Sequence, residues 1–290
     1  MPEVILEAVE VEFSYPDGTK ALDKVNLKIQ QGEKLAILGS NGAGKSTLFL
    51  HLNGIHRPNA GTIKYRGQDL SYKSMALIEL RKKVGIVFQD PDSQLFSASV
   101  WQDISFGPLN LGLSEEETAT RVKQAMEDTE TTELEDRPTH MLSYGQKKRV
   151  SIAGVLAMEP EVIIFDEPTA WLDPRHAREF MQLLDKLSSD GKTIVISTHD
   201  VDLAYSWADR IAIMDNGKII ADGDPAAIFT RSELVERADL ALPWLLEMHI
   251  ELVQKGWLPA TAPLPKTRAD LLRSIPGQPL KFKGQELKLG

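Results

Sequence analysis

Short apolar segments recur along the chain and predict a series of β-strands. Residues 23–29 alternate apolar and polar positions, which indicates a half-buried strand. The runs 162–165 and 193–197 are apolar almost throughout, as expected for parallel strands that are buried on both faces. Further strands are predicted at residues 34–38, 61–65 and 84–88, and the Asn216-Gly217 pair predicts a hairpin between 211–214 and 218–220.

Helical patterns are interspersed with these strands. Ser114 is followed three residues later by Glu117, a capping box that predicts a helix over 114–129. Further helices are predicted near residues 46–52, 147–158, 174–187 and 201–208. Strands and helices alternate within residues 1–220, except for a mostly helical stretch at about 89–160. We therefore predict an α/β fold with a helical insert.

The composition narrows the class of protein. The chain has 290 residues, of which 42 are acidic and 33 are basic, so its net charge is −9. This balance argues against a nucleic-acid partner, because nucleic-acid-binding domains usually carry a basic face. The chain has no Cys, which excludes disulfides and thiolate metal sites. Neither a signal peptide nor an apolar run of about 20 residues is visible, so we expect an intracellular protein without a membrane span.

A glycine-rich loop at residues 39–46 fits the pattern G-x-x-x-x-G-K-[ST], with a predicted strand before it and a helix after it. Its glycines let backbone N–H groups turn toward phosphate oxygens, and the helix start adds the positive end of a dipole. Lys45 adds a cation for the β- and γ-phosphates, and the Ser46 hydroxyl suits Mg²⁺. The expected nucleotide-binding residues are Gly39, Ser40, Asn41, Gly42, Ala43, Gly44, Lys45, Ser46 and Thr47.

Two acidic residues follow the buried strand 162–165. This strand should bring Asp166 and Glu167 to the carboxyl edge of the sheet, where ligands bind in open α/β folds. We expect Asp166 to hold Mg²⁺ and Glu167 to orient or deprotonate the attacking water. His199 follows the strand 193–197 and should reach the same edge. A lone His there would more often be structural. Because His199 occurs together with two phosphate motifs, the glycine-rich loop and the acidic pair, we favour a catalytic role for it.

A polar motif at residues 142–146, Leu-Ser-Tyr-Gly-Gln, precedes a predicted helix and is the last part of a larger constellation. The other parts are the two phosphate motifs, Gln89 after a strand, Leu172-Asp173 and His199. In this order the chain resembles the ATP-binding cassette (ABC) family over about residues 3–230. It departs from the family pattern at Tyr144, where Gly is common, and at Trp171, where a small residue is frequent.

The resemblance implies a P-loop NTPase core of the ABC ATPase type within residues 1–230, with a mixed sheet and a helical subdomain at about 89–160. It also implies a head-to-tail dimer, in which ATP lies between the phosphate loop of one subunit and Ser143 and Gly145 of the other.

The resemblance likewise assigns roles to single residues. Tyr15 would stack on adenine, although a packed turn aromatic is the alternative interpretation. Gln146 and Asp173 would belong to the nucleotide site. The implied catalytic residues are Lys45, Gln89, Glu167 and His199, and the implied Mg²⁺ ligands are Ser46, Gln89 and Asp166.

Residues 89–96, Gln-Asp-Pro-Asp-Ser-Gln-Leu-Phe, resemble the ATPase subunits of energy-coupling factor importers. Within that group, residues 142–149 and 165–173 look most like the cobalt or nickel members, and the other members import vitamins. The resemblance implies a membrane coupling subunit that docks near Asp90–Phe96, with Asp90 and Asp92 placed to pair with its basic residues. It further implies a membrane subunit that captures the substrate, and a peripheral location on the cytoplasmic face of the membrane.

Three rival classes are weighed against this interpretation. A cassette ATPase of DNA repair or chromosome organisation would insert long coiled coils between the phosphate loop and residues 142–146, where no heptads occur. A translation-factor type usually has two cassettes in one chain. A non-enzymatic nucleotide-binding module is disfavoured because the catalytic set is complete. A soluble, non-transport ABC ATPase remains the alternative.

The last 60 residues differ in composition. Residues 231–290 are rich in Pro and form a C-terminal extension, in which an apolar stripe at 244–253 predicts a helix. This helix has three interpretations: it packs on its own domain, it forms a dimer contact, or it binds a membrane surface. The last 25 residues are expected to be loosely ordered.

Overall fold

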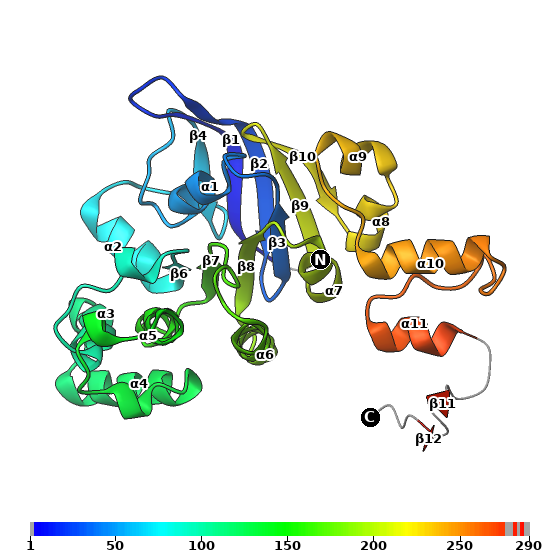
Figure 1. The fold of residues 1–290 in the computed structure, drawn as a ribbon. Coiled ribbons are helices and arrows are strands. Elements are labelled where there is room, and N and C mark those ends of the chain that lie inside the picture. The colour runs from blue at the N-terminus through cyan, green and yellow to red at the C-terminus, as the bar shows by residue number, and fades with distance from the viewer. Residues whose placement is uncertain (1–2, 276–280, 283–284, 287–290) are drawn as a thin grey trace.

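A six-stranded mixed sheet forms the centre of the molecule (Figure 1). The computed structural model describes residues 3–275, 281–282 and 285–286. The strand order is β10-β9-β3-β8-β7-β6, in which β3 pairs in parallel with both β8 and β9, and β10 is antiparallel to β9. The strands are β3 (Lys34–Leu38), β6 (Val84–Val87), β7 (Val162–Phe165), β8 (Thr193–Thr198), β9 (Arg210–Asp215) and β10 (Lys218–Gly223).

A second, antiparallel sheet covers one face of the first. Its order is β2-β1-β4-β5, with β1 (Val4–Ser14), β2 (Lys20–Gln30), β4 (Ala60–Tyr65) and β5 (Gln68–Asp69). Helix α1 (Lys45–Leu52) contributes Leu48 and Phe49 to the hydrophobic cluster that joins the two sheets. The opposite face is covered by α6 (Pro174–Ser189), α7 (Val201–Trp207) and α8 (Pro225–Phe229).

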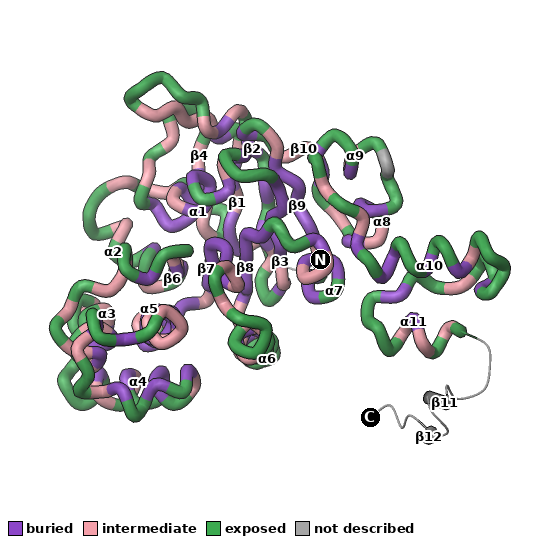
Figure 2. The backbone as a smooth tube through the Cα atoms, in the orientation of Figure 1, coloured by how far each residue is buried: buried purple, intermediate pink, exposed green. Residues whose placement is uncertain are grey.

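Strand β3 shows why both faces need a cover. Ala36 and Leu38 belong to the cluster under α6 and α7, whereas Leu35 and Ile37 belong to the cluster under the second sheet. Successive side chains of a strand point to opposite faces, so a strand with apolar side chains on both faces is stable only between two layers. Figure 2 shows that the buried residues concentrate in these central strands.

The predicted helical insert lies beside the β6 edge of the sheet and has its own hydrophobic cluster (Figure 1). Its main helices are α3 (Val100–Asn110), α4 (Glu115–Asp128) and α5 (Tyr144–Leu156), with short 3₁₀ turns η1 (Pro91–Ser93), η2 (Thr132–Leu134) and η3 (Thr139–Met141). The predicted capping box at Ser114 and Glu117 is present. Helix α5 begins earlier than residue 147, because Ser143 and Gln146 form a second capping box. Helix α2 (Ser74–Lys83) was not predicted.

The C-terminal extension packs on its own domain through α10 (Trp244–Gln254), which follows α9 (Ser232–Arg237). Leu245, Leu246 and Leu252 of α10 join the cluster that contains α7 and α8. The prediction of a loosely ordered tail is wrong for α11 (Arg268–Ser274), because Thr267 and Asp270 form a capping box that starts a helix. Short strands β11 (Lys281–Phe282) and β12 (Gln285–Glu286) follow, and the other residues after 275 lie outside the described range. Among the described residues, no helix is both long and apolar enough to span a bilayer.

Candidate functional site

The glycine-rich loop connects β3 to α1, and two of its glycines are required by close backbone packing. A Cβ atom on Gly39 would lie 2.2 Å from the carbonyl oxygen of Met214. A Cβ atom on Gly44, where φ is +105°, would lie 2.5 Å from the carbonyl oxygen of Ala21. Any side chain at these positions would therefore displace backbone. The two glycines of the motif are needed because the loop packs closely against β2 and β9.

Lys45 lies at the start of α1 and is buried, with its ammonium group directed back onto the loop. Its Nζ atom donates to the carbonyl oxygens of Gly39 at 2.7 Å and Ser40 at 3.2 Å. It also lies 3.7 Å from Oε1 of Glu167. The loop and the acidic pair, which are far apart in the sequence, thus meet at the predicted edge of the sheet.

The acidic pair is held by a residue that the sequence analysis did not single out, Ser197 on the neighbouring strand β8. The Ser197 hydroxyl donates to Oδ1 of Asp166 at 2.5 Å and accepts from the backbone N–H of Glu167 at 2.8 Å. Glu167 has a φ of 45°, a left-handed conformation that is costly for a residue with a side chain. Its other contacts suit a reactive carboxylate, since Oε2 lies 3.0 Å from Nδ1 of His199 and the buried Oε1 has no hydrogen bond.

A cavity of about 450 Å³ opens next to this pair. Its lining includes Asn41 of the loop, Gln89, Glu167 and His199, so four of the predicted site residues share one cavity. Trp171 also lines it, with 81% of its surface exposed and a φ of 65°. The Ser46 hydroxyl, the Asp166 carboxylate and the Gln89 carboxamide offer hard oxygen donors, the ligand type that Mg²⁺ prefers.

Tyr15 lies beside α1. Its hydroxyl is 2.9 Å from Oγ1 of Thr47, and its ring meets Phe13 edge-on with centroids 5.1 Å apart. The side chain is therefore packed against its own turn, as the alternative interpretation expects, and is also fixed next to the loop. The ring also meets His56 edge-on, with centroids 6.2 Å apart.

The residues of the predicted signature motif lie elsewhere. Ser143 is the N-cap of α5: its hydroxyl accepts from the N–H of Gln146 at 3.4 Å, and the Gln146 side chain accepts from the N–H of Ser143 at 3.0 Å. Asp173 similarly caps α6 through the N–H groups of Arg175 and His176. Ser143, Gly145, Gln146 and Asp173 are absent from the lining of the Glu167 cavity in this chain.

Comparison with known families decides the assignment. The family described as "ABC transporter" matches residues 22–170, which is half of the chain. This chain belongs to the ABC transporter family. A relative named energy-coupling factor transporter ATP-binding protein EcfA2, from Methanospirillum hungatei, is 50% identical over 94% of this chain and 68% of its own length. One named EcfA, from Methanosphaera stadtmanae, is 50% identical over 86% of this chain and 89% of its own length.

Solved structures agree with this family. CbiO1 of Clostridium perfringens, described as part of the ABC transporter complex cbiONQ, is 46% identical with a TM-score of 0.72, over 86% of this chain and 99% of that one. An ATP-binding cassette solved as a dimer with ADP and Pi is 29% identical with a TM-score of 0.70, over 76% of this chain and 99% of that one. The chain is an ATPase subunit of the energy-coupling factor type, as the sequence analysis expected.

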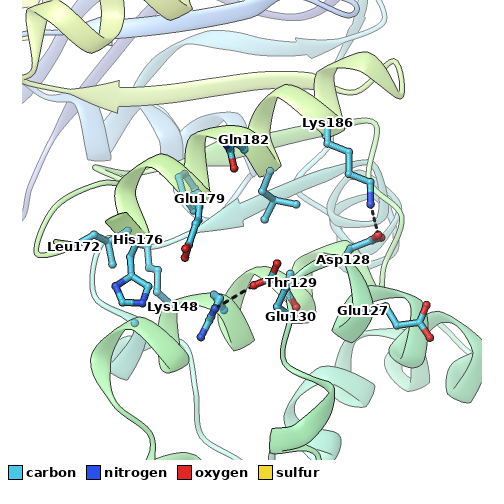
Figure 3. A pocket seen from close by; sticks show the side chains of 14 residues that line it. Glu127, Asp128, Thr129, Glu130, Lys148, Leu172, His176, Glu179, Gln182 and Lys186 are labelled. Atoms are coloured by element: carbon cyan, nitrogen blue, oxygen red, sulfur yellow. Dashed lines mark hydrogen bonds and ion pairs between the residues drawn. The ribbon is translucent and has the colours of Figure 1, made fainter. Parts of the chain in front are cut away.

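A second cleft of this ABC subunit, of about 320 Å³, separates the helical insert from α6 (Figure 3). Gly145 and Lys148 of α5 line it together with His176 and Glu179 of α6. Lys186 of α6 pairs with Asp128 of α4 across it at 2.7 Å (Figure 3). The N-terminal turn of α5 therefore borders this cleft. The Lys186–Asp128 pair is one contact that holds the helical insert against α6.

Lys148 is a further residue that the sequence analysis missed. It is 1% exposed, and its Nζ atom donates to the carbonyl oxygens of Phe88 at 2.8 Å and Gln89 at 3.0 Å. Burial lowers its pKa to about 8, although the charges of Asp166, Asp90 and Glu167 favour the ammonium form. Lys147 and Lys148 form a basic pair before Arg149, and nothing in the sequence indicates that Lys148 is buried. Ser197 gave a weak signal, as a polar residue within an apolar strand.

Proposed function

We propose that this ABC subunit hydrolyses ATP as one half of a head-to-tail dimer and thereby powers the import of cobalt or nickel ions. Residues 142–149 and 165–173, which look most like the cobalt or nickel members of the group, support this cargo. Vitamin import is the alternative cargo. The enzyme would act on the cytoplasmic face of the membrane, bound to integral membrane subunits. The observation that carries the enzymatic part is the set of contacts around Glu167, which lies 3.7 Å from Lys45, contacts His199 and shares one cavity with His199.

Glu167 is the proposed general base. His199 orients Oε2, and Oε1 has no hydrogen-bond partner although it lies 3.7 Å from Nζ of Lys45. Oε1 would accept the proton from water once the phosphates draw Lys45 away. Lys45 would bind the β- and γ-phosphates once they replace its carbonyl partners. Ser46, Gln89 and Asp166 would hold Mg²⁺, which when bound neutralises charge on the phosphates. Thr47 and the N–H groups of residues 39–46 would bind the remaining phosphate oxygens, and Tyr15 would contact the adenine.

A second subunit is needed to complete this site. Ser143 and Gly145 begin α5, whose first N–H groups suit an anion, yet they do not line the cavity of their own chain. A head-to-tail arrangement would bring them to the nucleotide of the partner. The dimeric form of the related cassette with ADP and Pi supports this proposal.

Docking of the membrane coupling subunit is proposed at the groove next to residues 90–96. This groove, of about 530 Å³, lies between β6 and the helical insert and is lined by Phe88, Gln94, Phe96 and Phe106, among others. Phe96 and Phe106 are exposed and meet edge-on with centroids 4.7 Å apart, which suits an apolar helix of a partner. Asp92 is already paired with Lys147 of this chain at 2.5 Å, so any contact with a partner would compete with that pair.

Co-purification from solubilised membranes tests the proposal. We expect the tagged subunit to bring down a coupling subunit and a substrate-capture subunit, and cells carrying the complex to take up labelled cobalt or nickel ions. A capture subunit that binds a vitamin would overturn the cargo, and the absence of any membrane subunit would overturn the transport role.

A charge reversal separates docking from internal stability. Asp92→Lys should reduce recovery of the coupling subunit while ATP binding persists. The control Lys147→Met removes the internal pair without reversing the charge of Asp92, and should retain the coupling subunit. Equal losses in both variants would show that the internal pair, and not docking, explains the effect.

A further inference from the structure

One face of α5 contacts the segment from Phe88 to Gln94 over two helical turns. Tyr144, Lys147, Lys148 and Ser151 stand at positions i, i+3, i+4 and i+7 and so share this face. Lys147 pairs with Asp92, and the carbonyl of Ser151 accepts from the side chain of Gln94 at 3.3 Å. The Gln94 side chain in turn accepts from the N–H of Phe88 at 3.0 Å. The segment is thus attached to the helix along its whole length.

The contact is densest at Gln89. Its carbonyl oxygen accepts from the Tyr144 hydroxyl at 3.1 Å and from Nζ of Lys148 at 3.0 Å. Lys148 also holds the preceding carbonyl, that of Phe88, at 2.8 Å. Two donors on one carbonyl, together with a third bond to its neighbour, fix the orientation of the peptide plane at Gln89. The buried ammonium group makes these bonds stronger than those between neutral groups.

Gln89 also lines the cavity that contains Glu167 and His199. We propose that Tyr144 and Lys148 are positioning residues for Gln89. The large side chain of Tyr144, at a position where Gly is common in the family, therefore turns onto its own chain. This inference rests on the proposed role of Gln89 in binding Mg²⁺ and water.

The ATPase rate of the purified dimer tests this inference. Tyr144→Phe keeps the ring and removes one hydrogen bond to the Gln89 carbonyl. We expect kcat to fall about 3- to 10-fold, the effect of losing one hydrogen bond in the transition state. The Mg²⁺ concentration for half-maximal rate should rise, while the affinity for ATP and the melting temperature stay unchanged. Tyr72→Phe is the matched control, because the buried Tyr72 hydroxyl has no hydrogen-bond partner.

A double-mutant cycle with Gln89→Ala separates positioning from general structure. If Tyr144 acts through the Gln89 side chain, then adding Tyr144→Phe to Gln89→Ala should lower the rate no further. Independent, multiplicative losses would overturn the inference, and so would a Tyr144→Phe variant with the wild-type rate and the wild-type Mg²⁺ requirement. If Gln89→Ala itself leaves the ATPase unchanged, the proposed role of Gln89 fails and the inference with it. Failure to recover membrane subunits would instead contradict only the transport role.

Discussion

Ser197 and Asp166, on neighbouring strands of the central sheet, are joined by a hydrogen bond of 2.5 Å between hydroxyl and carboxylate. The same hydroxyl accepts from the N–H of Glu167, so one small residue fixes both members of the acidic pair. All three residues are buried, and their hydrogen bonds therefore cannot be replaced by bulk water.

Replacing Ser197 should therefore affect both stability and turnover. Ser197→Ala leaves the Asp166 carboxylate without its donor and the Glu167 N–H without its acceptor. We expect the free energy of unfolding to fall by about 1–3 kcal/mol, the usual cost of an unsatisfied buried polar group. The ATPase rate should fall as well. Chemical denaturation and steady-state rates measure the two effects, with Ser189→Ala, an exposed residue of α6, as the control.

Removing the charge of Glu167 should stop the reaction after ATP has bound. Glu167→Gln keeps the shape of the side chain but cannot accept a proton. We expect turnover to fall by about 100-fold or more, in the range found for general bases, with ATP retained and the dimer held closed. Gel filtration with ATP and single-turnover hydrolysis would measure both effects. Turnover close to that of the wild type would contradict the role of Glu167 as the base.

Lys45→Ala should weaken ATP binding itself. A charged hydrogen bond to phosphate is worth about 1.5–3 kcal/mol, so the Kd for ATP should rise by about tenfold or more. Isothermal calorimetry would measure this change. Lys28→Ala, at an exposed position of β2, is the control for the loss of one positive charge. An unchanged Kd for ATP in Lys45→Ala would contradict the assignment of the loop.

Glu161 should make stability depend on pH. Burial alone would raise the pKa of Glu161, but hydrogen bonds from Arg66, Lys83 and Tyr65 outweigh it and hold the pKa at about 2, below the ordinary value of 4.5. A pKa that is lower in the folded state stabilises the fold above the unfolded pKa, and this contribution is lost as the pH falls from about 4.5 toward 2. The stabilisation is therefore complete at neutral pH.

The melting temperature of Glu161→Gln checks this dependence. We expect the variant to melt below the wild type at pH 7, with the difference shrinking as the pH falls from 5 toward 3. Glu133 is an exposed residue of η2, and Glu133→Gln should melt at the wild-type temperature throughout this pH range. A deficit for Glu161→Gln that stays constant over this range would mean that its ion pairs contribute little.

The two phosphate motifs could be located from the sequence because each joins a strand pattern to residues of restricted type. Gly39 and Gly44 are fixed by backbone contacts, and Asp166 follows a strand that is apolar at every position. The edge at which Lys45, Glu167 and His199 meet followed from the parallel order of the strands. These features depend on the local sequence, and the family resemblance added the role of the distant motif at residues 142–146.

Side-chain contacts between distant segments could not be predicted in the same way. Buried Lys148 donates to the carbonyl oxygens of Phe88 and Gln89. These partners lie about 60 residues earlier in the chain, so the Lys-Lys-Arg sequence alone does not predict the contact. Tyr144 stands out in the sequence only as a departure from the family pattern, and the contact of its hydroxyl with Gln89 of its own chain could not be predicted. Helix α2 has only one buried residue, Leu80, so its apolar pattern was too weak to predict it. The short helix α11 depends on a cap and on Leu271, which is buried in the hydrophobic cluster that also contains α7 and α10.

The position of β3 has a consequence for how the protein is made. This strand leads into the phosphate loop, and its two sheet neighbours are β8 and β9, which begin at Thr193 and Arg210. During translation the loop therefore leaves the ribosome long before either neighbour exists, and residues 39–192 must be made first. Contacts between segments so distant form slowly and expose apolar surface in the meantime. A nascent chain that stops before β8 would thus carry the complete phosphate motif without the two strands that pair with β3.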